Sequence, residues 1–95
     1  MKHFVIDCQG IATDADLWRR YLAVTNPAAG RDFGCNLDAF WDAVEGGGPG
    51  YPGRCKLTFK NAATLSHIKT GSGVSLLDAL QNIARAATVV VIEFK

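Results

Sequence analysis

The sequence predicts a small α/β domain in which helices pack against a three-stranded parallel sheet. Three segments have the composition of strands, and the gaps between them hold apolar residues at helical intervals. The order strand, helices, strand, helices, strand produces parallel strands joined by right-handed crossovers. With 95 residues, of which 48% are hydrophobic, the chain fits one domain, residues 1–95, with its own core.

The three predicted strands differ in their apolar pattern. His3–Asp7 is apolar at its centre and is expected to be a buried first strand. Arg54–Lys60 alternates apolar and polar residues, which predicts a strand with one face toward solvent. Thr88–Phe94 has the strongest strand signal, and its almost continuous apolar run is typical of a strand covered on both faces.

Four helices are predicted between these strands. The first begins at Thr13-Asp14-Ala15-Asp16, which has the spacing of a capping box with Asp in place of Glu. It ends at Asn26-Pro27, because proline disfavours helix in the residue before it. The other three are expected over Leu37–Glu45, Ala62–Ile68 and about Val74–Ala86.

The segment Gly46–Gly53 is rich in glycine and proline and is expected to be a flexible loop. Its residues 48–53 match the pattern GxGxxG. A dinucleotide site needs that pattern after a strand and at the start of a helix, whereas this segment precedes a strand. Its two prolines also lack the amide donors that would bind phosphate. No nucleotide and no other cofactor is therefore expected.

The cysteines and the hydropathy pattern bear on the compartment. Cys8, Cys35 and Cys55 are odd in number, so they cannot all pair within one chain, and they lack metal-binding spacing. No apolar run approaches the length of a membrane span, and Asp7 interrupts the apolar start too early for a secretory signal. We expect reduced thiols and a cytoplasmic protein without a membrane partner.

Charge is unevenly distributed along the chain. The net charge of +1 favours neither a nucleic-acid nor a membrane partner. Four acids and no Lys or Arg lie between positions 32 and 45, so the rest of the chain carries about +5. These four acids are Asp32, Asp38, Asp42 and Glu45.

The predicted helix over Leu37–Glu45 has two distinct stripes. An apolar stripe should be formed by Leu37, Phe40, Trp41 and Val44. An acidic stripe should be formed by Asp38, Asp42 and Glu45. Like charges one turn apart destabilise a helix, and acids near its C-terminal end oppose the helix dipole. A solvated polar face is the ordinary interpretation, but this placement favours a cationic partner.

Aromatic residues lie close to these acids in the sequence. Phe33 and Gly34 precede the helix, and Trp41 lies within it. Apolar side chains surrounded by charges are typical of interface hot spots. The alternative is that Phe33 and Trp41 belong to the core, with one edge of Trp41 exposed.

The run Asn36-Leu37-Asp38-Ala39, followed by Trp41-Asp42, resembles the central motif of the barstar family, the intracellular inhibitors of guanyl-specific secreted ribonucleases. The family pattern is aromatic-Gly-x-Asn-Leu-Asp-Ala, then an aliphatic or aromatic residue, then Trp-Asp. Residues 33–42 fit this pattern. At lower specificity the resemblance extends over the whole chain, through the order of the predicted elements.

The resemblance implies a barstar-like fold and a role for each motif residue. Asp42 corresponds to the acid that enters the catalytic pocket of the nuclease in place of the substrate phosphate. Asp38 corresponds to the neighbouring acid, which pairs with another cationic group. The resemblance also implies positions that touch or support the interface at Gly34, Asn36, Trp41 and Gly46. The implied partner is one secreted guanyl-specific ribonuclease in a 1:1 complex, with no direct contact to nucleic acid.

The chain departs from the family pattern in two contacts and one loop. Asp32 stands where the family often has an aromatic residue that stacks on the catalytic histidine. Asn82 stands where the last helix of the family offers a further acid. The loop Gly46–Gly53 is longer than the family leads us to expect. The peripheral contacts and the choice of target therefore remain open.

Two other functions stay as alternatives to an inhibitor that is not itself an enzyme. A barstar-like interaction or immunity domain could bind a partner that is not a ribonuclease. A small-molecule enzyme using Cys35 or the glycine-rich loop is less favoured, because no base is placed beside that thiol in the sequence. Inhibition of a guanyl-specific ribonuclease separates the first function from both alternatives.

Overall fold

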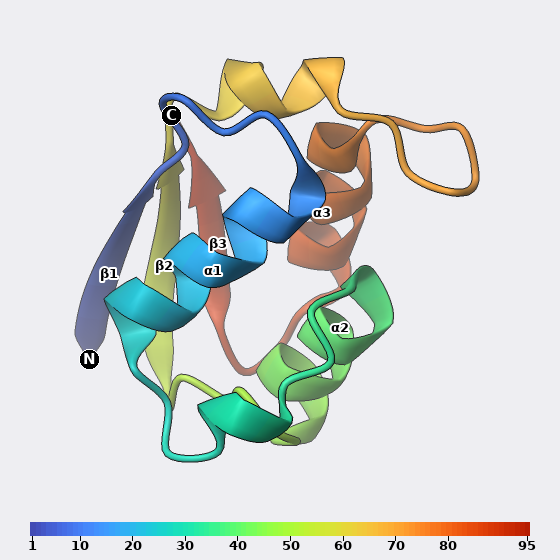
Figure 1. The fold of residues 1–95 in the computed structure, drawn as a ribbon. Helices are drawn as coiled ribbons and strands as arrows, with labels where there is room; N and C mark the ends of the chain where they lie inside the picture. The colour runs from blue at the N-terminus through green and yellow to red at the C-terminus, as the bar shows by residue number, and fades with distance from the viewer.

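The computed structural model describes residues 1–95, which form a three-stranded sheet with the helices gathered on one side (Figure 1). The strands are β1 (Lys2–Asp7), β2 (Cys55–Lys60) and β3 (Val91–Phe94). The α-helices are α1 (Asp14–Thr25), α2 (Leu37–Gly46) and α3 (Leu76–Ala86). Two 3-10 helices complete the fold, η1 (Gly30–Asp32) and η2 (Ala62–His67).

β2 is the central strand of the sheet. The order is β1-β2-β3, and both neighbours run parallel to β2. In the middle of the sheet Phe4 lies opposite Leu57, and Leu57 lies opposite Ile92. The predicted α/β fold with a small parallel sheet is confirmed.

The burial of the strands differs from the sequence prediction. Val5 in β1 and Val91 in β3 are each 47% exposed, so neither edge strand is covered on both faces. β2, for which one wet face was expected, is the best buried strand, and even its outward-facing Thr58 is only 3% exposed. The edge strands are exposed because the helices cover only one face of the sheet. β2 is better buried because β1 and β3 flank it on both sides.

The outer face of the sheet carries polar pairs between strands. His3 Nε2 and Thr58 Oγ1 share a hydrogen bond of 2.7 Å. Lys56 Nζ lies 3.0 Å from Glu93 Oε1, and this hydrogen bond lowers the pKa of the Glu93 carboxyl. These pairs link β2 to both edge strands on the solvent side.

The ends of α1 are those predicted from the sequence. The Asp16 amide donates to the Thr13 side chain at 3.2 Å, and the Thr13 amide donates to the Asp16 carboxylate at 3.1 Å. This pair is the expected capping box. At the other end Asn26 adopts a left-handed conformation with φ 43°, and the helix stops before Pro27.

An aromatic cluster joins α1, α2 and β2 beneath the helical layer. The ring of Phe40 in α2 lies 5.4 Å from the rings of both Trp18 and Tyr21, measured between centroids. Its centroid lies 6.3 Å from that of Phe59 in β2. Such pairs contribute about 0.5–1.5 kcal/mol each beyond the burial of their area. The cluster therefore fixes α2 on the sheet through Phe40.

The three thiols occupy different environments. Cys8 and Cys55 are fully buried, and Cys35 is exposed. Burial raises the pKa of the Cys8 thiol to about 11 and also raises that of Cys55. A buried, protonated thiol is a poor nucleophile.

We predict that one thiol of the native protein reacts promptly with an aromatic disulfide reagent and that two react only on unfolding. The prompt phase should be absent from Cys35→Ser and present in Cys8→Ala. Absorbance of the released thiolate, followed with and without denaturant, measures both phases. Three equally fast thiols would contradict the burial of Cys8 and Cys55.

Candidate functional site

The start of α2 is fixed by the side chain of Asn36. Its Oδ1 accepts a hydrogen bond from the Ala39 amide at 2.7 Å, which caps the helix. Its Nδ2 donates to the Gly34 carbonyl at 3.2 Å, and Cys35 between them has a left-handed φ of 53°. Asn36 therefore joins the loop to the helix, and Gly34 lies exposed at the same junction.

α2 buries one side and presents the other to solvent. Its fully buried residues are Phe40, Ala43 and Val44. The exposed face of α2 consists of Asp38, Trp41 and Asp42. Trp41, at the edge of the predicted apolar stripe, is 37% exposed, so most of it is covered and one edge faces solvent, as expected. The side chain of Ala43 also lies in the core, beside Phe40 and Val44.

Phe33 is a core residue. Its side chain is 6% exposed, and its ring lies 5.8 Å from Trp18 and 5.5 Å from Tyr21 between centroids. Its ring is therefore not available as an apolar contact for a partner. Of the two interpretations of Phe33, burial in the core is the correct one.

Three of the four acids form no ion pair and accept no hydrogen bond on their carboxylates within the protein. The two ion pairs of the structure, Arg19–Asp16 and Lys56–Glu93, lie elsewhere. The carboxylates concerned belong to Asp32, Asp38 and Asp42, and all three residues are exposed. They are free to meet charges supplied from outside.

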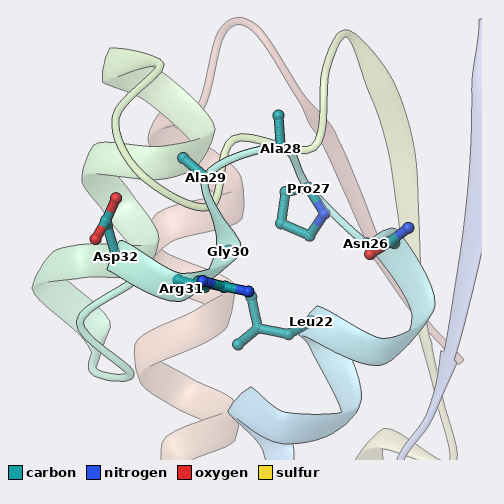
Figure 2. Close-up of a pocket in the computed structure, with 8 residues that line it drawn as sticks. All are labelled: Leu22, Asn26, Pro27, Ala28, Ala29, Gly30, Arg31 and Asp32. Carbon is teal, nitrogen blue, oxygen red and sulfur yellow. The ribbon is translucent and has the colours of Figure 1, made fainter.

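Asp32 lies in η1, on the loop between α1 and α2. Figure 2 shows its carboxylate pointing away from the neighbouring Arg31 side chain. A cleft of about 570 Å³ lies beside this loop, between the end of α1 and residues 26–32. Arg31 and Asp32 are the charged residues that line this cleft, and its other lining residues include no His, Cys or Ser that could act in catalysis.

A second cleft, of about 430 Å³, borders the exposed face of α2. It lies between the start of α2, where Asp38 stands, and residues 69–72. Lys69 also lines this cleft without forming an ion pair with Asp38. Nowhere in the structure do three His, Cys, Asp or Glu side chains come together as metal ligands. None of the helices has the length and hydropathy that a membrane crossing requires.

Asp42 lies in the last turn and a half of α2, where the helix dipole disfavours an acid. Gly46 is the last helical residue, and Gly47 is the left-handed cap with φ 71°. The Gly47 and Gly48 amides both donate to the Asp42 backbone carbonyl. None of these amides binds the Asp42 carboxylate, so the charge gains nothing from the fold.

Glu45 differs from the other acids because both oxygens of its carboxylate accept hydrogen bonds within the protein. Its two oxygens accept hydrogen bonds from the Thr88 amide at 2.7 Å and the Thr88 hydroxyl at 2.6 Å. These bonds lower the pKa of the Glu45 carboxyl. The inference that this acid does not support the fold is therefore wrong for Glu45, which ties the end of α2 to the segment before β3.

Asn82 lies exposed on α3 and is engaged by a cation. The Arg85 guanidinium donates to its side-chain oxygen, one turn further along the helix. The position therefore presents an amide paired with a positive charge, whereas the family resemblance implies an acid there.

The loop after α2 is held in place, in contrast to the flexible connection expected from its composition. The Tyr21 hydroxyl donates to the Gly50 carbonyl at 2.7 Å, and Gly50 and Pro52 are buried. Gly50 has φ 93°, and a Cβ there would lie 2.5 Å from Phe33 Cδ1. The apolar residues Tyr51 and Pro52 within the loop were the signal in the sequence for this packing.

The family model described as Barstar (barnase inhibitor) matches residues 1–95, the whole chain. The chain therefore belongs to the barstar family. Among curated proteins, none matches the chain. The family is described as one of barnase inhibitors.

We predict that Glu45→Gln lowers the melting temperature by a few degrees at neutral pH, because the amide is a weaker acceptor for Thr88. The isosteric Asp42→Asn should leave the melting temperature unchanged or raise it, because it removes a charge that opposes the helix dipole. Thermal unfolding followed by circular dichroism measures both variants.

The effect of Glu45 should depend on pH. Hydrogen bonds lower the folded pKa of Glu45 below its ordinary value of 4.5, so the unfolded chain binds this proton more readily. The stability that Glu45 adds is present above that ordinary value and is lost as pH falls through the lowered folded pKa. The difference between wild type and Glu45→Gln should then shrink in acid. An equal loss of melting temperature in Asp42→Asn would contradict the stabilising role of Glu45. A difference between wild type and Glu45→Gln that does not depend on pH would also contradict it.

Proposed function

We propose that this member of the barstar family inhibits a guanyl-specific secreted bacterial ribonuclease by covering its active site with α2 and the loop before it. The observation that carries the proposal is the exposed face of α2, where Asp38 and Asp42 form no ion pair within the protein. The family supports barnase-type ribonuclease inhibition. The residues and the mode of contact are our proposal.

The chemistry of the target explains the choice of an acid at position 42. A ribonuclease pocket binds a phosphodiester and therefore concentrates Arg, Lys and His. A carboxylate offers those groups negative charge and charge-assisted hydrogen bonds, often bidentate to Arg. It contains no scissile bond, so it occupies the pocket without being consumed. In this proposal Asp42 takes the place of the substrate phosphate.

Asp38 and Trp41 complete the proposed centre of the interface. Asp38 lies one turn before Asp42, at a Cβ separation of roughly 5–6 Å, so it can meet a second cation of the same pocket. Their mutual repulsion is relieved when cations bind. Trp41 offers an exposed apolar surface next to both carboxylates, and such surfaces exclude water from the charge pairs.

The other candidate residues have peripheral or supporting roles in this proposal. Asp32 and Gly34 lie on the loop, where we place the rim of the interface. Glu45 and Asn82 are occupied by Thr88 and Arg85, so they offer a partner little. Phe33 packs the loop onto the core, Asn36 caps α2 at its exposed start, and Gly46 ends the helix.

The proposed protein is a stoichiometric inhibitor and not an enzyme. His3 is engaged with Thr58 on the outer face of the sheet, and His67 is exposed at the end of η2. The Thr58 hydroxyl lies 2.7 Å from His3 Nε2, but Thr58 is only 3% exposed, so a substrate has little access to it. His67 has no hydrogen-bonded hydroxyl or thiol that it could activate. We place its action in the cytoplasm, where a ribonuclease made for secretion would otherwise degrade the RNA of the producing cell.

We predict stoichiometric inhibition of at least one guanyl-specific secreted ribonuclease. Residual cleavage of a fluorogenic RNA substrate should fall linearly and reach its minimum at one inhibitor per nuclease. The inhibitor alone should not cleave the substrate. No inhibition of any member of a panel of such nucleases at micromolar concentration would favour a partner of another kind.

We predict that Asp42→Ala weakens binding to that nuclease at least about tenfold more than Asp32→Ala. A charge desolvated against the cations of the pocket typically accounts for about 2–5 kcal/mol, mostly through slower dissociation, whereas a rim charge affects mainly association. Stopped-flow association and competition-based dissociation rates measure both variants.

Asp32→Ala is the matched control, because it removes the same side chain from an exposed site that is also free of ion pairs. Circular dichroism should verify that both variants are folded. Equal losses for the two variants would show that the binding energy is not concentrated at Asp42.

A further inference from the structure

The side chain of Asp42 lies directly against the backbone of the loop that follows α2. A Cβ built on Gly46 would lie 2.8 Å from Asp42 Oδ1. A Cβ built on Gly48 would overlap Asp42 Oδ2 and lie 2.8 Å from its Cγ. Cβ atoms essentially never make such short contacts. The carboxylate therefore occupies space that is available only because residues 46 and 48 have no side chain.

The backbone does not require glycine at either position. Gly46 is helical, where alanine is more favourable by about 1 kcal/mol, and neither Gly46 nor Gly48 has a left-handed φ. Gly47 between them is different, because its φ of 71° favours glycine and nothing lies within 4 Å of its Cβ position. The nearest atoms that a side chain at position 46 or 48 would meet belong to the end of the exposed Asp42 side chain, so it would displace that carboxylate rather than the backbone.

The loop is held firmly enough for this contact to act on Asp42. The Gly48 amide donates to the Asp42 carbonyl at 3.1 Å, and the Gly48 carbonyl accepts from the Tyr51 amide at 3.0 Å. The Asp42 carboxylate itself has no hydrogen bond within the protein. Its direction is therefore set by the space around it rather than by a donor.

We propose that Gly48, assisted by Gly46, is a positioning residue that directs the Asp42 carboxylate toward the nuclease. The proposal rests on the proposed function of Asp42. Gly48 contributes by its missing side chain, which lets Asp42 adopt one particular χ1 rotamer. A methyl group at position 48 removes that rotamer and turns the carboxylate away from the direction in which it meets the cations of the pocket.

The first arm of the test uses the free protein and no nuclease. In Gly48→Ala the three-bond couplings that report χ1 of Asp42, and its carboxyl carbon shift, should change to those of another rotamer. Gly46→Ala is a second variant with the same expected change and a favourable helix propensity. Gly71→Ala is the matched control, because position 71 has open space and no left-handed φ.

The second arm is a double-mutant cycle on binding. Gly48→Ala should weaken affinity for the inhibited nuclease at least about tenfold, mainly by faster dissociation. The same substitution in an Asp42→Ala background should change affinity less than about twofold, because the carboxylate it displaces is gone. Melting temperatures of wild type and Gly48→Ala should agree, so a general loss of structure does not account for the effect.

The two arms separate this inference from the proposed function. Unchanged couplings at Asp42 in both Gly48→Ala and Gly46→Ala would overturn the positioning role. An equal affinity loss with and without Asp42 would also overturn it, since Gly48 would then act on the nuclease directly. If the wild type bound no nuclease, the proposed function would fail, while the couplings would still decide whether Gly48 directs Asp42.

Discussion

The burial of Phe40 is the constraint on which the exposed face of α2 depends. Its ring contacts Trp18 and Tyr21 on α1 and Phe59 on β2, so one side of α2 cannot rotate away from the core. With that side fixed, helical geometry alone sends positions 38 and 42 to the opposite side and leaves Trp41 on the flank between them and the core. The acidic surface is thus oriented by apolar packing beneath it and not by any contact of its own.

The acids of α2 divide between stability and surface chemistry. Glu45 is satisfied by Thr88 and holds the end of the helix to the segment before β3. The carboxylate of Asp42, three residues earlier, accepts no hydrogen bond within the protein, and its charge interacts unfavourably with the helix dipole. A helix selected for stability alone would hold a neutral or basic residue at 42. The unpaired charge is tolerated because packing around Phe40 and the bonds of Glu45 stabilise the same helix.

The sequence predicted those features of the fold that depend on interactions between neighbouring residues. The capping box at Thr13, the end of α1 at Asn26 and the extent of α2 follow from neighbouring residues, and the structure confirms them. The motif on α2 was likewise visible as residue types at fixed spacing. The central position of β2 could not be predicted, because the alternation of apolar and polar residues does not indicate the order of strands in a sheet. The pairing of Glu45 with Thr88 could not be predicted either, because the two residues are far apart in the chain.

The central position of β2 has a consequence for how the chain acquires its shape during synthesis. Lys2 of β1 lies opposite Cys55, so the first strand has no partner until more than half of the chain has been made. Closing so long a loop carries an entropic cost, which makes such non-local pairing slow. α2 leaves the ribosome before Phe59, and Thr88 follows later still. The acidic helix therefore gains its fixed orientation only in a nearly finished chain, and a truncated product presents the same acids without a fixed arrangement.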